Sequence, residues 1–129
     1  MNSKNASVYK RVYKWMKANF RPAANRIQLS GYAVTHPVIR VINDSSKVGR
    51  ITLSVRDYYK NERGENVLEE QYFLLAFWNS KIQLYENLIT KGSFFSVRGK
   101  LSAKLPSPAS GQAEFRYEII VDEISIIKI

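Results

Sequence analysis

Residues 50–78 read Arg50-Ile-Thr-Leu-Ser-Val-Arg-Asp-Tyr-Tyr59, then Lys60-Asn-Glu-Arg-Gly-Glu-Asn66, then Val67-Leu-Glu-Glu-Gln-Tyr-Phe-Leu-Leu-Ala-Phe-Trp78. The two outer segments are rich in β-branched, apolar and aromatic residues, whereas the segment between them is charged and contains a glycine. In the first segment apolar and polar residues alternate, so that Ile51, Leu53 and Val55 share one face. Period-two alternation on either side of a polar turn predicts a β-hairpin.

The second strand of this hairpin is apolar on both faces. Phe73 and Phe77 lie on one side, and Tyr72 and Trp78 lie on the other, because successive strand residues point to opposite faces. We expect the Tyr72 side to meet the core, a following helix or a second subunit. The Phe77 side, which also carries Gln71, is then left as an exposed platform for a flat chemical group.

The composition excludes several classes of site. With 129 residues the chain is long enough for one domain with its own core. It contains no cysteine, and His36 is its single histidine, so a disulfide framework, a thiolate metal site and a catalytic zinc site are all excluded. We therefore expect no metal, no cofactor, no catalytic residue and no enzymatic activity. No apolar run has the length of a membrane span or signal peptide, so we expect a soluble protein of a reducing compartment.

The net charge of +9 is unevenly distributed along the chain. Residues 1–43 carry eight basic side chains and no acidic one, which leaves twelve basic against eleven acidic side chains in the remainder. A net positive charge is typical of proteins that bind nucleic acids. Here, however, the excess belongs to the N-terminal third, and the rest of the chain is close to neutral.

Residues 1–24 are predicted to form an N-terminal extension, separate from the main domain. Over residues 6–20, Val12, Trp15 and Met16 recur at helical spacing, and Lys10 and Lys14 follow the opposite stripe. This pattern predicts a basic amphipathic helix. Its apolar stripe favours packing on the main domain or on a neighbouring subunit, and its lysines could extend a binding groove. Binding to a membrane surface ranks below these alternatives, since the rest of the chain offers no second anchor.

Residues 25–129 predict an all-β domain. Strand patterns occupy residues 26–32, 38–43, 93–103 and 114–129 in addition to the hairpin, and residues 80–90 have helical spacing followed by a Lys-Gly stop signal. Five main strands with one helix between the third and the fourth is the element order of an OB-fold barrel.

The same region resembles the bacterial single-stranded DNA-binding protein family. The segments that carry the resemblance occur in the family's order: Asn25-Arg-Ile-Gln-Leu-Ser-Gly31, His36-Pro-Val-Ile-Arg40, Ile51-Thr-Leu-Ser54, Tyr58-Tyr-Lys60, Arg63-Gly-Glu65, Lys91-Gly-Ser93, Arg98-Gly-Lys-Leu101 and Glu118-Ile-Ile-Val121. Each string is short, but their order and spacing over about a hundred residues is fairly specific. His36 stands where the family has an acidic residue.

The resemblance implies a homo-oligomeric OB-fold protein, a tetramer or dimer, that binds single-stranded DNA with little sequence preference. It implies an accessory role in DNA replication, recombination or repair in the bacterial cytoplasm, in association with the nucleoid. Base stacking suits such a role, because every base has a π-face and stacking contributes about 1–3 kcal/mol per base. By this resemblance Tyr59 and Phe77 occupy stacking positions, with Phe73 and Tyr58 as further candidates.

Basic side chains are the candidates for phosphate contacts. They lie in or beside the predicted strands, and alternation places Arg98, Lys100 and Lys104 on one side of their strand. The complete set of phosphate candidates is Arg26, Arg56, Lys60, Lys91, Arg98, Lys100 and Lys104.

The chain also departs from the family pattern. Gln71 and the Leu105-Pro106 region stand where the family often has tryptophan, which predicts reduced or relocated stacking. The family's Gly/Gln-rich tail with an acidic tip is missing, so tail-mediated partner recruitment is not expected, and the N-terminal helix is an addition. Two alternatives therefore stay open: a primosomal-type OB dimer that acts mainly through protein partners, and an OB interaction protein that has lost DNA binding.

Overall fold

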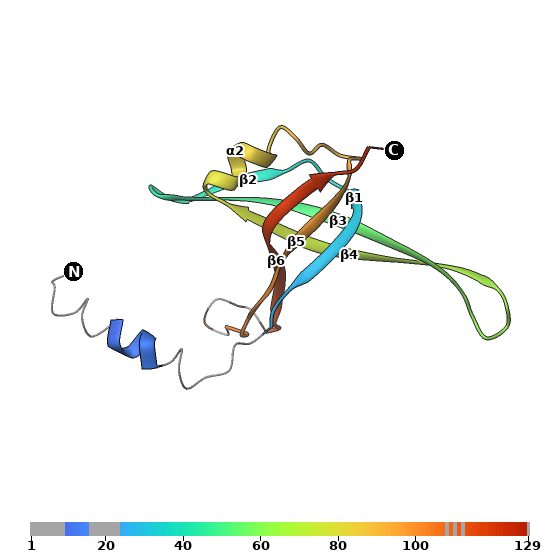
Figure 1. Cartoon of the computed structure of the whole chain (residues 1–129), viewed down its shortest axis with the longest axis horizontal. Helices are drawn as coiled ribbons and strands as arrows, with labels where there is room; N and C mark the ends of the chain where they lie inside the picture. The colour runs from blue at the N-terminus through green and yellow to red at the C-terminus, as the bar shows by residue number, and fades with distance from the viewer. Residues whose placement is uncertain (1–9, 16–23, 108, 110, 112, 129) are drawn as a thin grey trace.

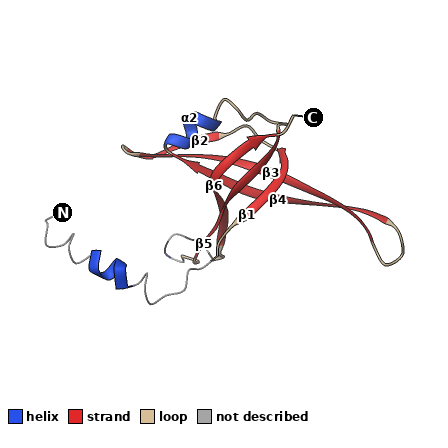
Figure 2. Ribbon diagram, viewed as in Figure 1, coloured by secondary structure: helices blue, strands red, loops and turns tan. Residues whose placement is uncertain are grey.

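The computed structural model describes residues 10–15, 24–107, 109, 111 and 113–128. In this part of the chain a strand-rich body carries the short helix α2, and residues 10–15 form a separate helical segment, as Figures 1 and 2 show. The elements follow one another as β1 (Ile27–Ala33), β2 (Val38–Asn43), β3 (Ser46–Lys60), β4 (Asn66–Trp78), α2 (Ser80–Tyr85), β5 (Phe94–Lys104) and β6 (Arg116–Ile126).

The strands form one sheet that closes into a barrel. Its order is β1-β5-β6-β4-β3-β2, and an additional pairing of β1 with β3 closes the ring. This closing pairing is short, with Tyr32 opposite Ser54 and Ala33 opposite Leu53. The predicted five-stranded barrel, with its helix between the third and fourth barrel strands, is therefore confirmed. Within the described residues β2 pairs with β3 alone, so it lies outside the closed ring.

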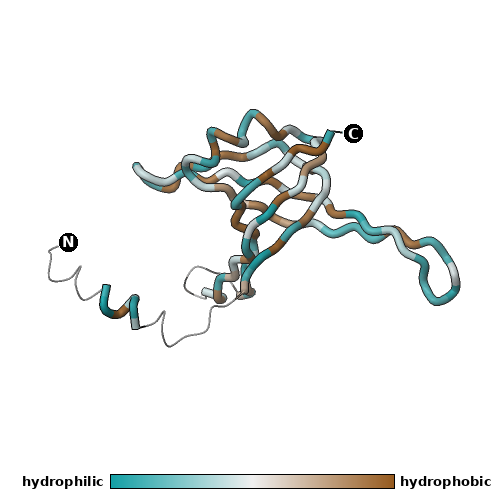
Figure 3. The backbone as a smooth tube through the Cα atoms, viewed as in Figure 1, coloured by the Kyte–Doolittle hydropathy of each residue, from teal (hydrophilic) through white to brown (hydrophobic). Residues whose placement is uncertain are grey.

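Strands β3 and β4 form the predicted hairpin, which is longer than the sequence pattern indicated. Their antiparallel register is continuous from Val48 opposite Trp78 to Lys60 opposite Asn66. Because β1 reaches only to Ser54 on β3, the remainder of the hairpin projects from the barrel as an arm, visible at the right of Figure 1. The end of this arm is mostly hydrophilic (Figure 3).

The barrel core consists of inward-facing residues from all five barrel strands and from the α2 region. Phe77, Phe95, Ile51, Leu53 and Leu75 are fully buried. The ring of Tyr85 from α2 meets the ring of Phe77 edge to face, with centroids 6.2 Å apart. Burying aromatic and aliphatic side chains in this way is the main source of stability in such a domain.

The predicted orientation of β4 is wrong. Phe77 lies in the core and Phe73 packs against it, whereas Tyr72 is exposed. Alternation identifies which residues share a face but not which face is covered, and β4 is apolar on both. The covered face is the one that pairs with Ile51 and Leu53 of β3. This is the apolar side of β3, which the closing barrel encloses.

The helix between β4 and β5 is shorter than predicted. α2 ends at Tyr85, and the backbone N–H groups of Leu88 and Ile89 both donate to the Tyr85 carbonyl, at 3.1 and 3.2 Å. This shared acceptor tightens the chain and ends the regular helix, as is common at helix C-termini. Ile89, which follows the helix, is still buried. The apolar spacing of residues 80–90 therefore identified a residue that packs in the core, although the helix does not extend to it.

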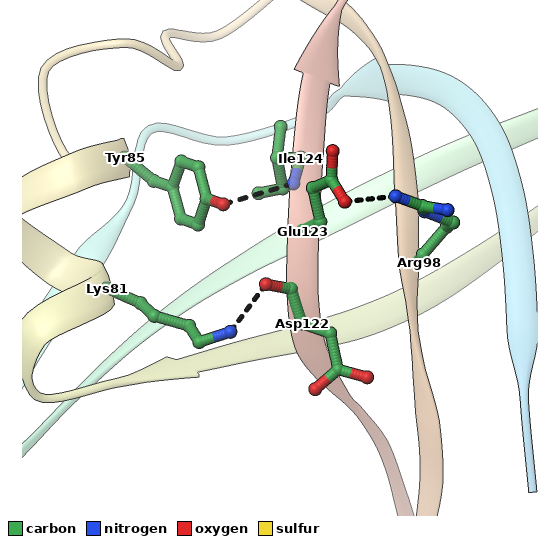
Figure 4. Close-up of polar contacts among 6 residues, drawn as sticks. All are labelled: Lys81, Tyr85, Arg98, Asp122, Glu123 and Ile124. Carbon is green, nitrogen blue, oxygen red and sulfur yellow. Dashed lines mark hydrogen bonds and ion pairs between the residues drawn. The ribbon is translucent and has the colours of Figure 1, made fainter.

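α2 is tied to β6 beside an irregularity in the sheet. The register between β5 and β6 shifts after Arg98, which leaves Asp122 without a register partner. As Figure 4 shows, the Asp122 carbonyl accepts a hydrogen bond from Lys81 Nζ, and the N–H of Ile124 donates to the Tyr85 hydroxyl at 3.2 Å. These contacts fix the helix over the barrel.

Residues 10–15 are helical and exposed. The predicted basic helix thus has its central part in the described region, while its remaining residues, 6–9 and 16–20, lie outside it. The alternatives for what its apolar stripe contacts stay open.

Gly31 is predicted to be essential for barrel closure. A Cβ atom at this position would lie 2.1 Å from the backbone carbonyl oxygen of Ser54, and backbone cannot move aside as a flexible side chain does. We expect Gly31→Ala to destabilise the fold by about 1–3 kcal/mol or more. Thermal unfolding followed by circular dichroism measures this loss. Ser30→Ala, an exposed change next to it, serves as the control, and equal melting of the two variants would contradict the prediction.

The Phe77 side chain is predicted to stabilise the fold. Since its ring is fully buried, Phe77→Ala should cost about 3–5 kcal/mol of unfolding free energy. Leu84→Ala on the exposed side of α2 should stay within about 0.5 kcal/mol of the parent. Urea unfolding of both variants provides the comparison, and a fully stable Phe77→Ala protein would rule out this packing.

Candidate nucleic-acid interface

The side of the β3–β4 hairpin that faces away from the core carries a group of exposed aromatic and charged side chains. The register places Tyr58 opposite Leu68, Arg56 opposite Glu70 and Ser54 opposite Tyr72. We call this surface the outer hairpin face; it comprises Thr52, Ser54, Arg56, Tyr58, Leu68, Glu70, Tyr72 and Leu74. Tyr58 is 73% exposed and Tyr72 is 62% exposed. Two exposed rings on one rigid sheet provide surfaces on which flat groups can stack.

Arg56 lies at the centre of the outer hairpin face. Its guanidinium carbon is 5.1 Å from the centroid of the Tyr32 ring, which is a cation–π distance. Tyr32 in turn packs against Phe94, with ring centroids 4.7 Å apart. Arg56 Nε is also 3.6 Å from Glu70 Oε2. The arginine is therefore held between an aromatic ring and a carboxylate.

Glu70 connects both strands of the hairpin. Its Oε1 atom accepts hydrogen bonds from Tyr72 Oη at 2.7 Å and from Ser54 Oγ at 2.9 Å. The bond from Tyr72, together with the smaller effects of Ser54 and Arg56, lowers the pKa of the Glu70 carboxyl. The same hydrogen bond raises the pKa of the Tyr72 hydroxyl. The carboxylate is thus ionised at neutral pH, and it fixes the position of the Tyr72 ring.

Two hollows adjoin this face. The first, of about 290 Å³, is lined by Arg56, Tyr72 and Lys91 among others. The second, of about 330 Å³, is lined by Leu74, Lys104 and Tyr117 among others, and lies toward β6. Tyr72 and Leu74 are neighbours on the same face of β4, so the two hollows are parts of one surface.

The second hollow contains another ion pair. Arg50 Nε is 3.0 Å from Glu118 Oε2, and both side chains are partly buried. Leu105 from the loop after β5 also lines this hollow and is exposed. The surface from Lys91 to Lys104 therefore carries apolar, aromatic, basic and acidic side chains.

The predicted stacking residues fall in different places. Tyr58 lies on the outer hairpin face, as a stacking residue must. Tyr59 is 46% exposed but lies on the opposite side of the arm, opposite Val67. Phe77 is fully buried in the core, and Phe73 is partly buried against it, so neither ring is exposed as those of Tyr58 and Tyr72 are. Sequence reasoning missed Tyr72 as a candidate, although its position opposite the polar Ser54 side of β3 would have indicated it.

The predicted phosphate contacts separate into two groups. Arg56, Lys91 and Lys104 lie on or beside the surface just described, and Lys60 ends β3 on the arm. Three others belong elsewhere: Arg26 and Arg98 line a third hollow with Asp122 and Glu123, and Lys100 is exposed on β5. Arg98 is paired with Glu123, as drawn in Figure 4. Acidic neighbours make this third hollow a weaker place for a phosphate.

Among the described residues, no group of three or more His, Cys, Asp or Glu side chains is placed to hold a metal ion. His36 is exposed, and its Nδ1 atom accepts a hydrogen bond from the Lys91 backbone N–H at 3.3 Å. The histidine therefore supports the loop before β5. Over the same part of the chain, no helix has the length and apolar character needed to cross a membrane.

The chain has recognisable relatives. Residues 24–127 match the family described as "Single-strand binding protein family". Single-stranded DNA-binding protein 2 of Staphylococcus aureus (strain Mu50) is 26% identical over 104 residues, which are 81% of this chain and 72% of that protein. The single-stranded DNA-binding protein of Lactiplantibacillus plantarum is 23% identical over 104 residues, 81% of this chain but only 51% of that protein.

Solved structures show the same fold. A Plasmodium falciparum SSB in complex with ssDNA superposes with a TM-score of 0.74 at 18% identity, covering 84% of this chain and 99% of that one. The wild-type single-stranded DNA-binding protein of Thermus aquaticus gives 0.72 at 17% identity, covering 84% of this chain and 52% of that one.

At these identities the structural likeness shows the fold alone. The family match, by contrast, is made by the sequence itself and extends over all six described strands and α2. The chain therefore belongs to the single-strand binding protein family.

Proposed function

We propose that this protein binds single-stranded DNA with little sequence preference, through base stacking and phosphate contacts. The observation that carries the proposal is the outer hairpin face, where the exposed rings of Tyr58 and Tyr72 lie beside Arg56. Family membership and relatives named as single-stranded DNA-binding proteins support it. Its role is accessory, in replication, recombination or repair.

The charges of this surface indicate that stacking contributes more than phosphate neutralisation. Arg56 is paired with Glu70 and Arg50 with Glu118, so two cations on the surface are already balanced. Lys91 and Lys104, at opposite ends of the surface, form no ion pair within the part of the chain that the structure describes, and they are the better phosphate contacts. A strand of DNA would thus cross β4 between them, with its bases toward Tyr72 and Leu74.

We further propose that the protein acts as a homo-oligomer, on nucleoid DNA of a bacterial cytoplasm. The exposed strand β2 supports self-association: Val38, Val41 and Ile42 present apolar side chains, and one edge of the strand is unpaired within the described residues. An exposed apolar edge strand is a common site of pairing with another chain. The bacterial origin of the curated relatives supports the location.

Binding is tested with fluorescently labelled oligo-dT at increasing salt concentration. We expect the parent protein to bind and the affinity to fall as salt rises, because phosphate contacts release counterions. Tyr72→Ala should weaken binding by roughly 5- to 150-fold, the equivalent of about 1–3 kcal/mol of lost stacking on one base.

Leu84→Ala is the matched control for this variant. Leu84 is 64% exposed on α2, against 62% for Tyr72, but it lies outside the outer hairpin face. The Leu84→Ala variant should bind oligo-dT with the same affinity as the parent. Undetectable binding by the parent would overturn the proposed function and favour an OB interaction protein, and equal losses in both variants would exclude this face as the binding site.

The mass of the protein in solution, with and without oligo-dT, tests the assembly. A tetramer or dimer that shifts to a complex with DNA is the expected result. A dimer that binds oligo-dT only at micromolar concentrations would instead favour a primosomal-type protein acting through other proteins. A monomer under all conditions would contradict the proposed homo-oligomer.

A further inference from the structure

We propose that Glu70 is a built-in competitor of DNA phosphate: its carboxylate occupies Arg56 and thereby keeps this arginine from contributing to binding. The inference rests on the proposed function and concerns the regulation of the same site. It assigns a role to a residue that lies in the middle of a DNA-binding surface yet carries the same sign of charge as DNA.

The geometry places the carboxylate where a phosphate would bind. Glu70 Oε2 is 3.6 Å from Arg56 Nε, and the guanidinium is held above the Tyr32 ring. Arg56 is therefore oriented, and the group it is oriented toward is an anion. A phosphate that approaches Arg56 must displace this carboxylate or share the arginine with it, and it meets like-charge repulsion in either case.

The carboxylate cannot easily move aside. Oε1 is held by the hydroxyl groups of Tyr72 and Ser54, which come from both strands of the hairpin. Ser54 is itself buried, so its hydroxyl is a fixed donor. Because these bonds favour the ionised form, Glu70 remains charged at the pH at which DNA binds. Arg56 is consequently neutralised in the free protein.

This arrangement has a measurable consequence for salt dependence. For single strands, the slope of log K against log salt concentration changes by about 0.7 for each phosphate that a cation neutralises. A neutralised Arg56 contributes little to the slope. Glu70→Gln keeps an amide oxygen to accept from Ser54 and Tyr72 but removes the negative charge, so Arg56 becomes available.

We therefore expect Glu70→Gln to bind oligo-dT more tightly than the parent and to steepen the slope by about 0.7. Between 200 and 50 mM salt, its advantage over the parent should grow by roughly threefold. Fluorescence anisotropy titrations at four or more salt concentrations give the slope. Thermal unfolding of the same samples verifies that the barrel is intact.

Glu69→Gln is the matched control. It removes the same charge from the adjacent residue, which lies opposite Asp57 on the other side of the arm. Its slope should equal that of the parent. If Glu69→Gln changes the slope as much as Glu70→Gln, the effect is one of overall charge and the proposal is wrong.

Arg56→Gln completes a double-mutant cycle. In the parent it should change the slope only slightly, whereas in the Glu70→Gln background it should remove the gain of about 0.7. Weaker binding by Glu70→Gln, or an unchanged slope, would show that the carboxylate serves only to position Tyr72 and would overturn the inference. Failure of the parent itself to bind oligo-dT overturns the proposed function instead, and the two results are thus distinct.

Discussion

The barrel closes where Gly31 of β1 passes directly over the backbone of Ser54 in β3, and the rest of the structure depends on this close approach. The pairing that follows is only two residues long, Tyr32 with Ser54 and Ala33 with Leu53. It links β1, at one end of the sheet, to β3 and encloses one face of β3. Since β4 pairs with β3 along its whole length, the same contact decides which side of β4 is buried and which is left to solvent.

The closing contact also builds the candidate site. Tyr32 reaches over the edge of β3 and meets Arg56, and the buried Ser54 donates to Glu70. Glu70 then links Arg56 to Tyr72 across the hairpin. A contact that stabilises the fold thus orients the aromatic and charged groups of the surface. Preorganisation of this kind lowers the entropy lost on binding, since the side chains are already ordered.

This surface carries less unpaired positive charge than the net charge of +9 for the whole chain suggests. Arg50 and Arg56 are paired with glutamates, and Lys91 and Lys104, which form no ion pair within the described residues, lie at its ends. The excess positive charge is instead in the N-terminal third of the chain. Affinity from stacking and affinity from charge are therefore carried by different parts of the molecule, and the two respond differently to salt, because only the second involves counterion release.

The hairpin at residues 50–78, the order of the strands and the resemblance to the family follow from the sequence by itself, because alternation, turn residues and motif spacing are local properties. The sequence also indicated that Tyr58 and Tyr59 face opposite sides of their strand, but it assigned the stacking position to Tyr59. Only the tertiary structure decided that Phe77 is core and Tyr72 is surface, and that Arg26 and Arg98 lie apart from Arg56. The physical reason is that a strand with two apolar faces specifies which residues point the same way, whereas the closure of the barrel by β1, distant in sequence, determines which of those faces is covered.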